Sequence, residues 1–252
     1  MEDELPSSIR PAAPELAYLQ LLHLADSAFP IGALAHSFGI ESMVSAGLLA
    51  TLDLEFFLRD YLEEAGVVEA VFCREAVRLA REAPSDFPGA RWRDLSDQLA
   101  ALKPAREARA GSAALGRNFL RAALALGEFN ILRQALETTD EPSRPDLFDC
   151  RSGMIEHPTA FGLVGGALHF DEDSVVLAYL HQFAASSVSA FQRLLPLGQT
   201  QATRILWNLK PAMIETATRS AALSLDNLSS FTPLLDWGAM EHPALSTRLF
   251  IS

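Results

Sequence analysis

Residues Leu21 to Glu41 read LLHLADSAFPIGALAHSFGIE, an apolar run that also carries polar and ionisable side chains. Among them, Asp26, Ser27, His36, Ser37 and Glu41 flank a helix break at Pro30 and Gly32. Burying polar groups in an apolar environment costs free energy unless they are hydrogen-bonded. This stretch therefore predicts either a functional site or a set of side chains that cap helix ends.

Composition narrows the class of protein. The chain has 252 residues, of which 49% are hydrophobic, enough for one large core. Its net charge of -12 argues against nucleic acid binding and suits either a basic protein partner or ordinary solubility. No apolar run reaches the roughly 18 residues that span a membrane. The opening MEDELPSSIRPAAPE lacks the features of a signal peptide, so we expect a cytoplasmic protein.

Helical periodicity dominates the sequence. From Thr51 to Glu82, apolar residues recur at three- and four-residue spacing. Further helices are predicted over residues 91–102, 103–127, 129–136, 159–170, 174–194 and 215–223, with another that starts near Thr200 and is interrupted by Pro211. We predict an all-α fold, a single globular domain of about nine or ten helices with no strand. This domain would span residues 18–252, after a flexible acidic and proline-rich segment over residues 1–17.

Several residues predict local structure. Thr51 or Asp53, Asp171 or Asp173, and Thr200 are candidate helix caps. Pro158, after His157, suits the first position of a helix. Gly162, Gly165 and Gly166 follow no strand and precede no lysine, so we interpret them as sites of close helix packing. Cys73 and Cys150 form no CxxC pair, and we expect buried thiols.

Catalytic and metal chemistry find little support in the sequence. It contains no GxxxxGK[ST] phosphate loop and no GxSxG elbow. No two histidines stand at the i, i+4 spacing of a preformed metal site, although His23, Asp26, His36 and Glu41 share one segment. Two alternatives stay open: a nickel-carrying metallochaperone that uses His23, Asp26 and His36, and an α-helical serine hydrolase that uses Ser27 or Ser37 with His36.

Five segments, in order along the chain, resemble the urease accessory protein UreF family. They are LLHLADSAFPIGALAHSFGIESMVSAGL from Leu21, LKPAREARAGSAALGRNFL from Leu102, HPTAFGLVGGAL from His157, RLLPLGQTQATRIL from Arg193, and FTPLLDWGAMEHPALSTRLFIS from Phe231. The first is similar to the family's LLQLADSxxPxGxFxHSxGLE. Departures are few: Phe38 stands where the family usually has Gly, Ile40 where it usually has Leu, and Ala33-Leu34 where a small residue and Phe are typical.

The resemblance implies an all-α protein that is not an enzyme. UreF-like proteins bridge UreD (also called UreH) and the GTPase UreG, and the assembly regulates GTP-dependent nickel insertion into apo-urease. The resemblance therefore implies UreD/UreH and UreG as partners, contact with apo-urease through UreD, and a homodimer. It implies no tightly bound cofactor and no resident metal, with nickel handled transiently, and neither nucleic acid nor membrane as a partner.

The resemblance also assigns residues to partner surfaces. Asp26, Ser27, His36, Ser37 and Glu41 match the first motif and are candidates for the UreG docking surface or a channel. Arg193 and Gln199 match the RLxPLGQ motif and are candidates for the dimer or UreG interface. Arg248, Leu249 and Phe250 match the terminal motif and are candidates for ordering against UreD.

Overall fold

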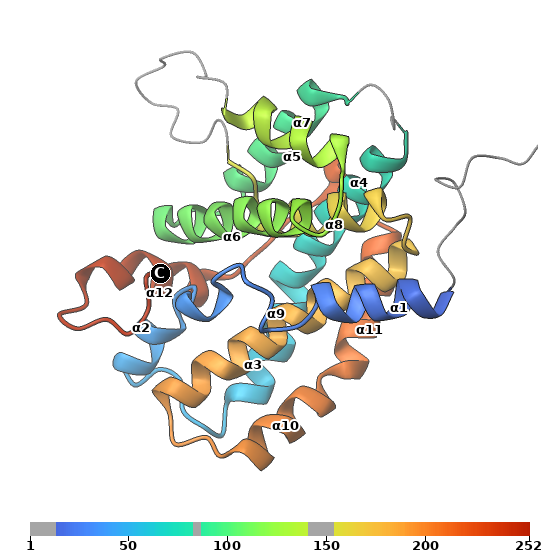
Figure 1. Cartoon of the computed structure of the whole chain (residues 1–252). Coiled ribbons are helices and arrows are strands. Elements are labelled where there is room, and N and C mark those ends of the chain that lie inside the picture. The colour runs from blue at the N-terminus through green and yellow to red at the C-terminus, as the bar shows by residue number, and fades with distance from the viewer. Residues whose placement is uncertain (1–13, 83–86, 141–153) are drawn as a thin grey trace, which may run out of the picture.

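The computed structural model describes residues 14–82, 87–140 and 154–252, and within these ranges the chain is helical without a strand (Figure 1). This confirms the predicted all-α fold. The α-helices, in chain order, are α1 (Pro14–Leu24), α2 (Ile40–Ser45), α3 (Leu54–Tyr61), α4 (Val67–Glu82), α5 (Gly89–Ala101), α6 (Arg106–Leu124), α7 (Asn130–Asp140), α8 (His157–Ala167), α9 (Glu172–Leu194), α10 (Gln199–Asn208), α11 (Lys210–Ala221) and α12 (Pro233–Glu241).

Shorter helical turns complete the described chain. A 3₁₀ turn covers Ala33–Ala35, and others cover Leu225–Asn227 and His242–Ala244. A π-helical turn, Leu62–Gly66, joins α3 to α4, so the predicted helix over 51–82 is continuous from Leu54. Helix α1 begins at Pro14, inside the segment predicted to precede the domain.

Helix α4 is the centre of the core, and α8 packs along it more extensively than any other pair of helices in the described chain. Glycines make this approach possible. A Cβ atom on Gly162 would overlap the backbone oxygen of Cys73, and one on Gly166 would lie 2.6 Å from the backbone oxygen of Val77. The predicted packing role of these glycines is confirmed. The Cys73 thiol is buried here, and burial raises its pKa; Cys150 lies outside the described residues.

The predicted helix starts are partly right. The side chain of Asp171 accepts a hydrogen bond from Ser174 N and caps α9, and Pro158 occupies the first turn of α8. Thr200 is not a cap, because α10 already begins at Gln199 and Gly198 holds the cap position. Asp53 precedes α3, but its carboxylate accepts from Ala50 N instead of from the helix.

Helix α9 corrects one expectation. By length and composition it could span a membrane, which the sequence was expected not to allow. Its apolar residues have a different use, because α9 packs against α4, α8, α10 and α11. Helices buried on several sides are apolar around most of their circumference.

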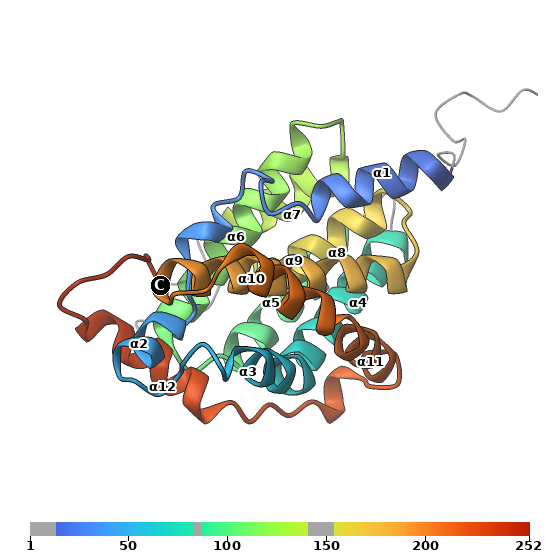
Figure 2. The same ribbon diagram turned by 90° about the horizontal axis from the view of Figure 1, so that it is seen from below.

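The N-terminal third and the C-terminal end of the chain meet on one side of the molecule. Helix α12 packs across α2, and Figures 1 and 2 show the end of the chain beside both helices. Gly39 and Gly238 lie at this crossing, where a Cβ on Gly238 would be 2.6 Å from the backbone oxygen of Gly39. This juxtaposition positions the candidate site.

A substitution at the α4–α8 contact tests the packing. We expect Gly162→Ala to lower the free energy of unfolding by about 1–3 kcal/mol or more, because the added methyl must push the two helices apart. Gly198→Ala is the matched control, since no atom lies within 4 Å of its Cβ position. Denaturant titration of both variants measures the difference, and equal stabilities would contradict the packing described.

Candidate functional site

The carboxylate of Glu41, in the first turn of α2, is buried and binds the C-terminal segment of the chain. It accepts hydrogen bonds from the backbone N–H groups of Leu249 (2.7 Å) and Phe250 (3.2 Å). The Nε2 atom of His242 lies 3.0 Å from the same carboxylate. Hydrogen bonds to an ionised acceptor are stronger than neutral ones, so this single side chain holds residues 249 and 250 against α2.

His242 extends the same network to α6. Its ring is fully buried, and its Nδ1 atom lies 2.7 Å from an oxygen of Glu107. The other Glu107 oxygen is 3.3 Å from a guanidinium nitrogen of Arg248. Both imidazole nitrogens therefore face carboxylates, and both can donate only when the ring carries a proton on each nitrogen.

The last residue of the sequence, Ser252, binds the segment just before α2. Its backbone oxygen accepts from the N–H groups of Ser37 (2.5 Å) and Phe38 (3.2 Å). Its hydroxyl lies 2.7 Å from Nδ1 of His36, and the N–H of Ile251 donates to the backbone oxygen of Ala35 at 2.8 Å. These bonds join residues 35–38 and 251–252 over an extended contact.

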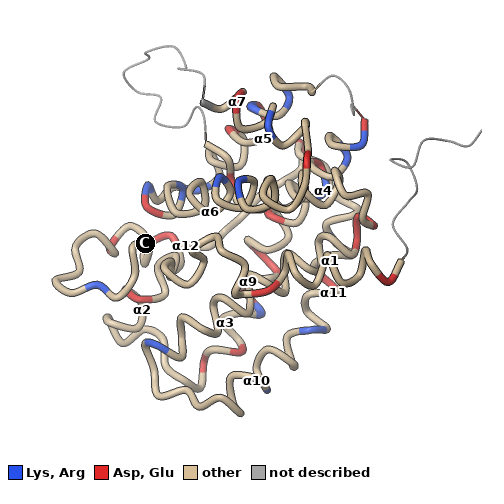
Figure 3. Tube along the Cα trace, viewed as in Figure 1, with Lys and Arg blue, Asp and Glu red and all other residues tan. Residues whose placement is uncertain are grey.

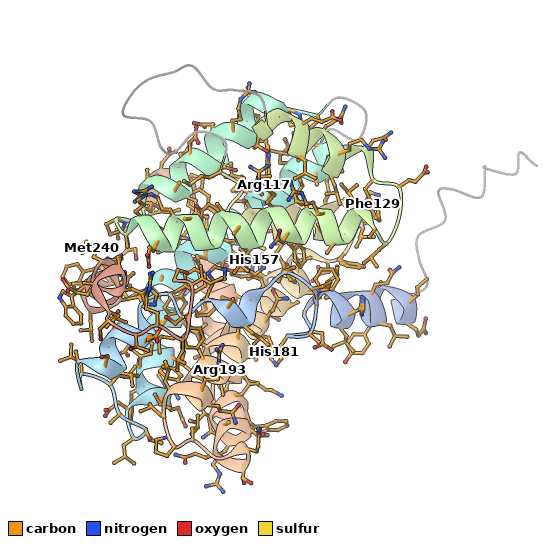
Figure 4. All side chains as sticks on the ribbon, turned by 60° about the vertical axis from the view of Figure 1, so that its left-hand side comes forward. Arg117, Phe129, His157, His181, Arg193 and Met240 are labelled. Carbon is orange, nitrogen blue, oxygen red and sulfur yellow. The ribbon has the colours of Figure 1, made fainter. Side chains whose placement is uncertain are left out.

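Arg193, near the C-terminus of α9, contacts the same two segments. Its guanidinium donates to the backbone oxygens of Leu34 (2.6 Å) and Leu249 (3.2 Å) and stands 4.2 Å from the ring centre of Phe250. Figure 4 labels Arg193. We call the whole set the tail site: residues 34–41, Glu107, Arg193, His242 and residues 248–252.

The backbone of the tail site is strained at one residue. Phe38 has φ 50°, a left-handed conformation that a bulky side chain rarely adopts, and Gly39 follows with φ 92°. A glycine at position 38 would adopt this conformation without a steric penalty, so the departure noted in the sequence places a residue here that the backbone disfavours. The Phe38 ring stacks on His36, with 5.6 Å between ring centroids.

The structure brings together most of the residues that the resemblance singled out. His36, Ser37, Glu41, Arg193, Arg248, Leu249 and Phe250 all belong to the tail site. Asp26 and Ser27 are exposed beyond the end of α1, where Asp26 accepts from Ala28 N, and Gln199 is exposed at the start of α10. These three lie outside the tail site.

Sequence reasoning missed other members of the tail site. Glu107 and His242 lie inside the second and the fifth of the quoted segments, but neither was given a role. Gly111 of α6 leaves room for the tail site, since a Cβ there would lie 2.6 Å from the Ser252 hydroxyl and 3.0 Å from Nδ1 of His36. The available signal was Gly111 within an alanine-rich helix, which marks a close approach.

A second polar cluster is buried between α4, α6 and α8. The ammonium group of Lys103 lies 2.8 Å from Glu156 and 3.1 Å from Glu69. The phenol groups of Tyr61 (2.9 Å) and Tyr179 (2.8 Å) donate to the same Glu69 oxygen. Burial and the nearby Glu69 carboxylate raise the pKa of both tyrosines, so they stay neutral donors. The half-buried Lys103, just before α6, thus pairs with one carboxylate from α4 and with one from the residue that precedes α8.

The tail site offers little for the open chemical alternatives. His36 meets the hydroxyl of Ser252 rather than Ser27 or Ser37, and the Ser37 hydroxyl accepts from Glu41 N. His23 packs edge-on against Phe29. Among the residues that the structure describes, no three His, Cys, Asp or Glu side chains form a group that could hold a metal ion.

Fold and site together define a class: an all-α protein in which a set of polar residues binds the C-terminal segment of the same chain. The UreF family model matches residues 50–210. The chain is 33% identical to the urease accessory protein UreF of Bradyrhizobium sp. strain BTAi1, over 94% of this chain and 92% of that protein. It is also 33% identical to UreF of Rhodopseudomonas palustris strain BisA53, over the full length of both. The chain belongs to the urease accessory protein UreF family.

The Glu41 carboxylate gives a direct test of the tail site. In Glu41→Gln, one acceptor oxygen becomes an NH₂ group that faces N–H donors, so we expect a loss of about 1–3 kcal/mol in stability. We also expect faster trypsin cleavage after Arg248. Asp26→Asn, which neutralises an exposed carboxylate of the same motif, is the control and should change neither quantity. Equal cleavage rates in the two variants would refute the role of Glu41.

His157 predicts an acid-sensitive stability. Burial lowers its pKa to about 4; Glu69 opposes this shift, while Lys103 and His36 add to it. As the pH falls below about 6.5, the ordinary pKa of a histidine, His157 becomes protonated in the unfolded chain but stays neutral in the folded protein. The free energy of unfolding therefore decreases as the pH falls, until about pH 4. We expect His157 to lower the free energy of unfolding by about 3 kcal/mol between pH 7 and pH 4.

The control for this prediction is His157→Gln, which cannot titrate. Its free energy of unfolding, measured by denaturant titration between pH 7 and pH 4, should fall less steeply by that amount. If the free energy of unfolding depends on pH in the same way in both proteins, the pKa of His157 is not lowered in the folded state.

Proposed function

We propose that this protein is a non-catalytic scaffold in urease maturation, which bridges a UreD/UreH protein and the GTPase UreG and regulates GTP-dependent nickel insertion into apo-urease. Family membership supports the accessory role. The sequence contains no phosphate loop of its own, which agrees with a separate GTPase partner. The observation that carries the proposal is the tail site, which joins two candidate partner surfaces.

The first surface is the outer face of α12 and the adjoining tail. Helix α12 is apolar on both faces: one packs on α2, and the other exposes large side chains. The exposed residues are Phe231, Leu234, Trp237, Met240, Leu249 and Ile251. Figure 4 shows Met240 at the outer edge of the molecule. Exposed aromatic and methionine side chains gathered on one element favour a protein interface, and we assign this face to UreD.

The second surface surrounds the exposed part of the first motif. Asp26 and Ser27 are accessible, whereas Ser37 and Glu41 are buried and His36 is half-buried under the tail. In this proposal Asp26, Ser27 and the exposed Gln199 are available to UreG. The buried residues act indirectly, because they fix the backbone that presents the surface. Arg193 acts in the same way, since its guanidinium is already bound to both segments.

The remaining features of the proposal follow the family. The protein would act in the cytoplasm as a homodimer, contact apo-urease through UreD, and handle nickel only transiently. Figure 3 shows basic residues along α6 on a chain whose net charge is -12. Because the chain as a whole is acidic, we expect it to associate faster with a basic partner than with a neutral one, and the rate of association to fall as the salt concentration rises.

Co-purification with UreD and UreG tests the scaffold directly. We expect all three proteins to form one complex at micromolar concentration, and Trp237→Asp to weaken UreD binding by at least about tenfold, since it places a charge in an apolar contact. Leu52→Asp is the control, because Leu52 is also an exposed apolar side chain but lies beside α10. Absence of any complex, with all three proteins folded, would overturn the proposal.

Removal of residues 248–252 tests the role of the tail. We expect UreD binding to weaken while the helical content, measured by circular dichroism, stays unchanged, because these residues lie beyond the last α-helix. Unchanged affinity for UreD would refute the assignment of the tail to that interface.

A further inference from the structure

A cavity of about 80 Å³ lies between α12 and the polar cluster around Lys103. The chain that leads from α11 into α12, which Figure 2 shows along one side of the molecule, contributes Ser230 and Thr232 to its wall. Helix α12 itself contributes Asp236. These three residues are only partly buried, so the cavity opens to solvent beside the start of α12.

The polar cluster on the inner wall is satisfied by its own members. The ammonium group of Lys103 has three N–H donors. Two of them meet Glu156 (2.8 Å) and Glu69 (3.1 Å), and the third meets the hydroxyl of Ser112 (3.1 Å). The other oxygen of Glu69 accepts from two tyrosine hydroxyl groups. Lys103 therefore has no donor left for a further carboxylate in the cavity.

Asp236 is that further carboxylate. One of its oxygens accepts from the Thr232 hydroxyl at 3.3 Å, and among the described residues no Lys, Arg or His forms an ion pair with it. Burial raises the pKa of Asp236, which means that the ionised form is poorly solvated in this position. A nearby cation stabilises such a carboxylate. The charge of the cavity therefore favours a cation as its occupant.

The rest of the lining and the size of the cavity define that cation further. Phe183, Leu99 and Leu235 are among the apolar side chains of the lining, so the occupant needs an apolar stem as well as a charged end. Lysine and arginine side chains have this form. A water-sized group needs about 10–15 Å³, so the cavity holds about five to eight of them, the size of one such side chain.

The position of the cavity indicates where this side chain comes from. Asp236 lies in α12 beside the exposed Trp237, in the helix whose outer face is a candidate partner surface. A protein bound there would cover the open side of the cavity and withdraw Asp236 further from water. Withdrawal of a charge without a partner costs free energy. The net charge of -12 makes this chain complementary to a basic partner.

We propose that this cavity receives a lysine or arginine side chain of the protein that docks on α12, with Asp236 as its counter-ion. In the proposed function, on which this assignment rests, that protein is UreD. The apolar face of α12 supplies contact area, and the ion pair fixes the register of the two proteins. A protein that lacks the basic side chain would leave Asp236 desolvated and unpaired, so the cavity also discriminates between partners.

Removal of the charge tests the counter-ion. Asp236→Asn keeps the shape of the side chain and an acceptor for Thr232, and we expect its dissociation constant for UreD to rise at least about tenfold. Asp226→Asn is the matched control, because it changes the net charge equally at an exposed residue that does not line the cavity. It should bind UreD as tightly as wild type does.

Filling the cavity tests it without a change of charge. Ala65 lines the cavity, and the larger side chain of Ala65→Leu occupies the space, so affinity for UreD should fall several-fold while circular dichroism shows the wild-type helical content. A crystal structure of the wild-type complex should place a Lys or Arg nitrogen of UreD within about 4 Å of the Asp236 carboxylate.

Failure here differs from failure of the proposed function. If wild type binds UreD and both Asp236→Asn and Ala65→Leu bind it equally well, the cavity receives no basic side chain, although the scaffold stands. A complex structure in which Asp236 meets no cation, or in which a second copy of this chain fills the cavity, overturns the assignment even where a variant does not fold. Absence of any wild-type complex with UreD overturns the proposed function and, with it, the assigned occupant.

Discussion

The buried carboxylate of Glu41 is the group on which the candidate site depends. It receives two backbone N–H groups from the C-terminal segment and the imidazole of His242. A carboxylate that stayed buried without such donors would carry a desolvation penalty of several kcal/mol, so Glu41 is buried only while the tail covers it and supplies them. Through His242 and Glu107, the same network reaches α6. The Glu41 side chain thus couples three elements that lie far apart in the sequence.

The core supplies the rigid frame for this coupling. Glycines let α8 approach α4 closely, and the Lys103 cluster joins both to the start of α6. Helix α6 then presents Gly111 and Glu107 to the tail. The tail site is consequently a largely buried set of contacts between the C-terminal segment, residues 34–41 and α6.

Local features could be predicted from the sequence because their causes are local. Asp171 caps α9 through Ser174, and Pro158 starts α8, as residue type and spacing indicated. Thr200 was predicted wrongly because a threonine in the first turn of a helix carries the same signal as one at the cap. The bonds of Glu41 to residues 249 and 250 join positions about two hundred residues apart, and no periodicity encodes that pairing. The resemblance grouped these residues by motif, but the contact itself required the structure.

Amide hydrogen exchange of the wild-type protein tests the central claim most directly. If Glu41 and Ser252 hold the two segments together, the N–H groups of Leu249, Phe250 and Ser37 will exchange far more slowly than those of Leu52, an exposed residue outside the tail site. Exchange of these three amides at the rate of unstructured chain would show that the C-terminal segment is not bound to α2, and would contradict the account.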